Sequence, residues 1–235
     1  MYTHLDADKT LATIERLCRR IHERFPQAGL SEVCQELQTI ANNAKARATK
    51  LAQPLYGLRF FVIVLIVATL CVLAYTVLHI RFSVEKLSAA DFAQIMDAGF
   101  NELVLLGAAL FFLVTIEARI KRTRVTKALH ELRSIAHVID MHQLTKDPSL
   151  FFTNMNATKS SPERKMTPFE LTRYLDYCSE MLALTSKIAA LYAQSFNDAV
   201  VVAAVNDFET LTASMSRKVW QKMMMVKDEP DTPSA

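Results

Sequence analysis

The chain has 235 residues, of which 27 are Lys or Arg and 24 are Asp or Glu, so its formal net charge is only +3. This charge is too small to indicate nucleic-acid binding, and the basic residues form no patch interleaved with aromatic residues, so we expect no nucleic-acid partner. The chain contains only 4 glycines and 7 prolines, and no segment alternates apolar and polar residues over the length of a strand. We therefore predict an all-α fold.

Two amphipathic helices are predicted before residue 54, and together they form an N-terminal cytoplasmic helical hairpin over 1–54. Residues 8–25 carry apolar side chains at three- and four-residue spacing, at Leu11, Ile14, Cys18, Ile21 and Phe25. Residues 30–52 repeat the pattern at Leu30, Val33, Leu37, Ile40, Ala44, Ala48 and Leu51. The short connection between the two helices favours antiparallel packing. Because the first fifty residues are polar and helical, we expect no signal peptide.

The most apolar part of the chain is residues 60–80, FFVIVLIVATLCVLAYTVLHI, which carries no charge at neutral pH when His79 is neutral. A helix of these 21 residues extends about 30 Å, the thickness of the hydrocarbon core of a bilayer. Fourteen of the residues are Leu, Ile, Val or Phe, and together they favour insertion by about 4–8 kcal/mol. We predict a transmembrane helix over about 59–80.

A second apolar run covers residues 103–116, about 21 Å of helix, and it spans a bilayer only if residues 100–102 enter the interface. Ser88 and Asp91 resemble a capping box that begins a helix there, and no strong breaker follows before about residue 143. We predict a second span over about 100–118, an outer loop over about 81–99 and a cytoplasmic extension of the span over 119–144. A long buried helix is the alternative.

The basic residues near the two predicted spans indicate an orientation. Nine of them lie before the first span or after the second, and two lie between the spans, at Arg81 and Lys86. Because basic flanks stay in the cytoplasm, we predict a transmembrane hairpin over 55–118 with both termini cytoplasmic. The short loops favour the inner (plasma) membrane of a bacterium, and the lipid bilayer is the first expected partner.

The sequence Thr167-Pro168-Phe169-Glu170 is the strongest local signal, because it combines an N-cap Thr, a Pro at the first helical position and a Glu at the third. The helix that follows carries a stripe of Leu171, Leu175, Cys178, Leu182, Thr185, Ala189 and Tyr192. After a turn at 196–198, a last helix carries Val201, Val205, Phe208, Leu211, Met215 and Val219. We predict a C-terminal helical hairpin over 167–225, preceded by a loop over 145–166 and followed by a disordered tail over 226–235.

The four cysteines are widely separated, and no CxxC pair occurs. Cys18, Cys34 and Cys178 fall at apolar positions of the helical patterns, where a free thiol behaves as a small hydrophobic group. We expect all three to be reduced core residues on the cytosolic side of the membrane.

A polar stripe at the entrance of the second span is one candidate site. It contains Gln94, Asp97 and Asn101, with Glu102 beside it. Ionisable residues at membrane depth usually face a water-filled path or a partner, so the stripe could form an ion or solute route in an oligomer. The favoured interpretation is that these residues lie above the bilayer, with Glu102 paired to Arg81 or His79, because the apolar run ends there.

Three further groups of residues follow the second span. The basic run is interpreted as contacting lipid headgroups, through Arg119, Lys121, Arg122, Arg124 and Lys127. His130, His137, Asp140 and His142 have side chains that bind transition metals, but without a His-x-x-x-His or Glu-x-x-His repeat a polar packing face is favoured, and no metal site is predicted. Trp220 and Met223–Met225 could form a docking surface, although packing in the core is the favoured interpretation.

No motif names a reaction: there is no glycine-rich phosphate loop, GxSxG, HExxH or paired-carboxylate motif. We therefore expect no catalytic residues, no cofactor and no enzymatic activity. The predicted function is a membrane protein whose cytoplasmic helical bundle is an interaction, scaffold or sensory module for an unidentified cytoplasmic protein, with room for a homo-oligomer. In layout the chain resembles the two-span effector domains of bacterial conflict systems, which implies the alternative of a small oligomeric channel or pore-forming effector.

Overall fold

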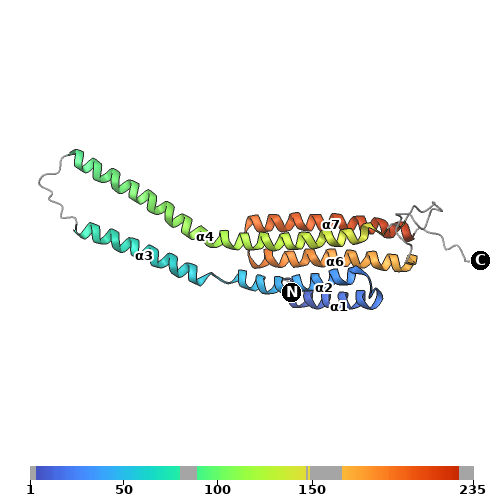
Figure 1. The fold of residues 1–235 in the computed structure, drawn as a ribbon. Helices are drawn as coiled ribbons and strands as arrows, with labels where there is room; N and C mark the ends of the chain where they lie inside the picture. Colours follow the sequence, from blue (N-terminus) through green and yellow to red (C-terminus); the bar gives the residue numbers. More distant parts are fainter. Residues whose placement is uncertain (1–3, 80–88, 147, 149–165, 228–235) are drawn as a thin grey trace, which may run out of the picture. The chain divides into compact units, whose positions relative to one another are not determined.

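The computed structural model describes residues 4–79, 89–146, 148 and 166–227, and every regular element in these ranges is a helix, as predicted (Figure 1). The chain divides into two compact units, which we call the larger unit (Met1–Ala52 and Arg122–Ala235) and the smaller unit (Gln53–Lys121). The helices are α1 (Ala7–Arg24), α2 (Gly29–Ala52), α3 (Tyr56–His79), α4 (Ala89–Leu144), α6 (Pro168–Ser195) and α7 (Ala199–Lys227).

α4 has 56 residues without a break, which confirms the predicted helix from about 89 to 143. Residues 89–99, inside the predicted outer loop, are therefore helical. The capping box at Ser88, most of the predicted loop over 145–166 and the last eight residues of the predicted tail lie outside the described residues.

The larger unit is built around one hydrophobic core, to which α1, α2, α4, α6 and α7 all contribute. Figure 1 shows these helices lying alongside one another in this unit. The predicted stripes supply the core, because Ile14, Leu37, Leu175 and Phe208 are each at most 1% exposed. Their burial confirms the periodicity on which the helices were predicted.

α6 is buried on more sides than its sequence indicates. All seven residues of its predicted stripe are buried, and so are Tyr174, Tyr177, Met181 and Leu184 between them. The cause is that α6 packs against α1, α2 and α7. A heptad pattern identifies only one packing face of such a central helix.

Local signals define the ends of these helices. The backbone N–H of Glu170 donates to the Thr167 hydroxyl (3.2 Å), and the Glu170 carboxylate accepts from the Thr167 backbone N–H (2.8 Å). This confirms the predicted capping box. The predicted turn also lies where expected, because α6 ends at Ser195 and α7 begins at Ala199.

Cys18 on α1 and Cys34 on α2 form a disulfide, so the expectation that both are reduced is wrong. Both cysteines belong to the buried stripes of helices that pack against each other, and this packing brings the two sulfur atoms together. Cys178 is a free, buried thiol, as expected. Burial raises the pKa of Cys178 to about 12, so it stays protonated at neutral pH.

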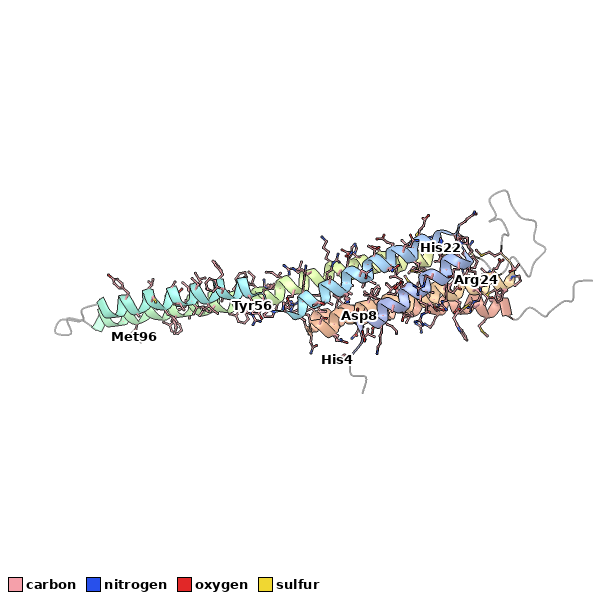
Figure 2. All side chains as sticks on the ribbon, turned by 90° about the horizontal axis from the view of Figure 1, so that it is seen from below. His4, Asp8, His22, Arg24, Tyr56 and Met96 are labelled. Carbon is pink, nitrogen blue, oxygen red and sulfur yellow. A yellow bond between two sulfur atoms is a disulfide. The ribbon has the colours of Figure 1, made fainter. Side chains whose placement is uncertain are left out.

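The smaller unit exposes most of its apolar side chains. Phe60 on α3 is 70% exposed and Phe111 on α4 is 73% exposed. Figure 2 shows side chains projecting outward along this unit, with Tyr56 at the start of α3 and Met96 near the start of α4. Among the residues that the structure describes, two helices are long and apolar enough to cross a membrane, and almost none of either apolar segment is buried within the protein.

Candidate functional site

The polar stripe predicted at the entrance of the second span lies entirely on α4, within the smaller unit. Asp97 and Asn101 are one helical turn apart, and both are exposed. The side chains of Gln94, Glu102 and His79, and all of Arg81, lie outside the described part of the structure. The predicted pairing of Glu102 with Arg81 or His79 is therefore not described.

The five basic residues predicted to contact lipid headgroups have different environments. Arg119 is exposed and lies over the ring of Phe112, 5.4 Å from its centroid. Lys121 is buried beside Glu117, with Nζ 3.1 Å from a carboxylate oxygen. Arg122 donates two hydrogen bonds to Asp198. Arg124 and Lys127 are exposed and form no ion pair with any residue that the structure describes, so both are accessible to an anionic ligand.

Glu117 is a polar centre of the smaller unit that the sequence prediction did not include. Its carboxylate accepts hydrogen bonds from Arg59 on α3 (2.8 and 3.4 Å) and from the backbone N–H of Leu55 (3.4 Å). Lys121, one turn further along α4, pairs with the same carboxylate. The sequence does contain a signal for this ion pair. Glu117 directly follows the apolar run over 103–116, and Arg59 directly precedes the apolar run over 60–80, so two opposite charges flank the two runs.

A cavity of about 300 Å³ lies in the larger unit where α2, α4 and α6 meet. This volume is at the lower end of the range for small-molecule sites, about 300–1,000 Å³. We call the cavity the basic pocket, and it is lined by Arg47, Lys50, Leu51, Arg124, Lys127, Glu131 and Tyr192. Four cations and one carboxylate line it, so its electrostatics favour an anion.

The cations of the basic pocket differ in whether they already have a partner. Arg47 donates a hydrogen bond of 2.6 Å to Glu131, and this bond raises the pKa of Arg47. Lys50, Arg124 and Lys127 are exposed and form no ion pair with any residue that the structure describes. Three charges in the pocket therefore remain uncompensated at neutral pH.

The floor of the basic pocket is apolar and aromatic. Leu51 is 4% exposed and Tyr192 is 1% exposed. Burial raises the pKa of Tyr192, and the neighbouring Arg47 guanidinium partly opposes this shift. Tyr192 is therefore neutral at physiological pH and adds no negative charge to the pocket.

The four residues of the His/Asp group lie on α4 but do not converge. His130 and His137 are exposed, whereas Asp140 accepts a hydrogen bond of 2.7 Å from the Gln143 side chain. His142 is half-buried, with Nδ1 3.4 Å from the Tyr174 hydroxyl. Across the described residues, no cluster of three or more His, Cys, Asp or Glu side chains suited to a metal ion occurs.

Trp220 on α7 is exposed, so the interpretation that it packs in the core is wrong. Its side chain is 58% exposed, and Met224, one turn later, is 38% exposed. The cause is the helical period: Met215 and Val219 occupy the buried face of α7, and Trp220 falls beside that face.

The pocket residues Arg47, Lys50, Glu131 and Tyr192 were not predicted as site residues, because they come from three helices that are distant in sequence.

Comparison of the chain with protein-family models, with curated proteins and with solved structures finds no match.

Proposed function

We propose that this chain is a non-enzymatic integral membrane protein that holds a partner protein at the membrane surface. In this proposal α3 and the apolar part of α4 anchor the chain in the bilayer. The helices of the larger unit form the cytoplasmic bundle that binds the partner. The single observation that carries the partner site is the exposed Trp220 on α7.

Anchoring in a bilayer is supported by the exposed apolar side chains of the smaller unit. Phe60, Phe61, Leu103, Leu105 and Phe111 are all more than 60% exposed. Large apolar side chains exposed in this number favour aggregation in water, whereas in a bilayer the lipid chains cover them. The two apolar helices satisfy their backbone hydrogen bonds internally, as a bilayer requires.

The cytoplasmic orientation of the larger unit is supported by the nine basic residues outside the spans against two between them. The Cys18–Cys34 disulfide argues in the opposite direction, since disulfides are rare in the cytosol. We give the charge bias more weight because it acts during membrane insertion, whereas two adjacent thiols can oxidise wherever an oxidant reaches them.

The partner surface is proposed on α7, where Trp220, Met224 and Met225 are exposed. Trp is enriched among the residues that contribute most to protein interfaces, and Met adapts to the shape of a partner. Arg217 and Lys218 are exposed close by on the same helix and have no described ion-pair partner. This charge favours a cytoplasmic protein that presents an apolar anchor flanked by acidic residues, such as an amphipathic helix.

The test is site-specific photo-crosslinking of the full-length protein in cells. A photoreactive residue at position 220 should capture one partner, and the double change Arg217→Glu/Lys218→Glu should abolish the capture. Phe169 is the matched control position, because it is an aromatic residue of similar exposure, 62%, at the start of α6. Crosslinks only to a second copy of the chain, or the same product from position 169, would refute a specific partner site at Trp220.

A small channel is the second candidate function, and it is favoured by one observation. Asp97 and Asn101 are exposed one turn apart on α4, just before its apolar run over 103–116. Liposomes that contain the purified protein test it directly, because an anchor leaves them tight to ions. Leakage that is abolished by Asp97→Ala/Glu102→Ala would support the channel and contradict the anchor.

A further inference from the structure

The basic pocket has no role in the proposed partner binding, and its lining belongs to α2, α4 and α6, whereas Trp220 belongs to α7. Its chemistry is distinctive, because cations line an opening whose floor is a buried tyrosine and a buried leucine. We propose that the basic pocket binds a phosphate-bearing anion.

The charge distribution of the pocket selects this class of ligand. Lys50, Arg124 and Lys127 supply ammonium and guanidinium donors that no described carboxylate compensates. Phosphate oxygens accept several charge-assisted hydrogen bonds at once, and an arginine fork can bind two of them together. A zwitterionic or neutral ligand would leave these donors unsatisfied.

The pair formed by Arg47 and Glu131 holds a fourth cation in a fixed position. Glu131 accepts a hydrogen bond from the Arg47 Nη1 at 2.6 Å, and both residues line the pocket together with Tyr192. Arg47 is therefore oriented before a ligand arrives, which lowers the entropy lost on binding. The same carboxylate opposes an anion, so Glu131 limits the affinity of the pocket.

A lipid headgroup and a soluble phosphate compound share this chemistry. Lys50 lies six residues before the start of α3, and Arg124 lies eight residues after the apolar run that ends at Ile116. Pocket residues are therefore close in sequence to both apolar helices, so a lipid headgroup is one source of the anion to test. The cavity volume of about 300 Å³ accommodates either source.

Two measurements on the full-length protein distinguish the sources. Isothermal titration with inorganic pyrophosphate, in nanodiscs of phosphatidylcholine, measures binding of a soluble anion. Native mass spectrometry in detergent measures retention of phosphatidylglycerol relative to phosphatidylcholine. A soluble ligand predicts binding of pyrophosphate, and a headgroup predicts selective retention of phosphatidylglycerol.

The variant Arg124→Gln/Lys127→Gln removes two uncompensated cations and should weaken the binding that is observed by about tenfold or more. Glu131→Gln should strengthen it, because it removes the opposing carboxylate. Arg16→Gln/Lys187→Gln is the matched control, since it makes the same change of net charge at two exposed positions outside the pocket. Circular dichroism verifies that each variant is folded.

The proposal is overturned if the wild-type protein binds neither probe selectively. It is also overturned if the pocket variant and the control variant weaken binding equally, because the interaction would then depend on total charge and not on the pocket. These measurements use neither the Trp220 surface nor its partner, so their failure is independent of the proposed partner function.

Discussion

Arg122 on α4 donates two hydrogen bonds to Asp198, the residue immediately before α7, with Nε–Oδ1 and Nη2–Oδ2 distances of 3.0 and 2.7 Å. The Asp198 carboxylate also accepts from the backbone N–H groups of Val200 and Val201. One side chain therefore caps α7 and joins it to α4. The hydrogen bond from Arg122 holds the pKa of Asp198 below its usual value, although burial opposes this effect.

Asp198→Ala should lower the free energy of unfolding by about 1–2 kcal/mol, because it removes the helix cap as well as the partner of Arg122. Asp198→Asn should have a smaller effect, since an amide oxygen can still cap α7. Thermal unfolding of the full-length protein in detergent, followed by circular dichroism, measures both. Asp207→Ala, at an exposed position on α7, is the control; an equal effect there would show that Asp198 has no special role.

His142 should make the larger unit less stable in mild acid. Burial lowers the pKa of His142, and the nearby charge of Lys146 adds to this effect while Glu32 opposes it. The unfolded chain therefore binds a proton more readily than the folded protein. The free energy of unfolding is therefore not reduced by His142 above the pKa of this residue in the unfolded chain, about 6.5. It decreases as the pH falls from there toward the lower pKa of His142 in the folded protein.

The measurement is the unfolding midpoint in denaturant between pH 7.5 and pH 5. His142→Gln should reduce the dependence on pH over this range, whereas His137→Gln, at an exposed position of the same helix, should leave it unchanged. A profile that is identical in the wild type and in His142→Gln would contradict this assignment.

Gly29, at the start of α2, allows His142 to approach closely. A Cβ atom at position 29 would lie 2.8 Å from Cε1 of His142, which is too close for carbon atoms. Gly29→Ala should therefore destabilise the protein by about 1–3 kcal/mol, and in the background of His142→Ala the same change should be neutral or stabilising. Unfolding measurements on the double-mutant cycle give the coupling directly.

Gly57→Ala is the matched control for this cycle, because nothing lies within 4 Å of a Cβ atom at that position. Additive effects of Gly29→Ala and His142→Ala would show that the two residues are not in contact.

The Cys18–Cys34 disulfide predicts that two of the four cysteines have free thiols in the unreduced protein. Purified protein that is unfolded without reductant should react with two equivalents of maleimide, at Cys71 and Cys178, and with four after reduction. Cys18→Ser/Cys34→Ser should give two under both conditions and unfold more easily, because a cross-link that closes a loop of this length contributes about 3 kcal/mol. Four reactive thiols in the unreduced wild-type protein would contradict the pairing.

The features that could be predicted from the sequence are those that depend on residues close together in the chain. The capping box of Thr167 and Glu170 was predicted because it needs four consecutive residues, and α4 was predicted because no strong breaker interrupts it. The buried stripes follow from helical periodicity alone.

The features that were missed depend on how helices pack. Cys18 and Cys34 meet because α1 and α2 pack with these two positions facing each other, and spacing alone does not specify that alignment. Arg59 and Glu117 are 58 positions apart. The basic pocket combines side chains of α2, α4 and α6, so no single stretch of sequence contains its pattern.

In the proposed topology, α3 and the apolar part of α4 cross a membrane and the larger unit lies on the cytoplasmic side. The most direct test attaches paired reporters in a bacterial host, green fluorescent protein and alkaline phosphatase, after residue 235 and after residue 84. This topology predicts fluorescence without phosphatase activity at position 235, and phosphatase activity without fluorescence at position 84. The same pattern at both positions would contradict the first span, and the reversed pattern would contradict the orientation.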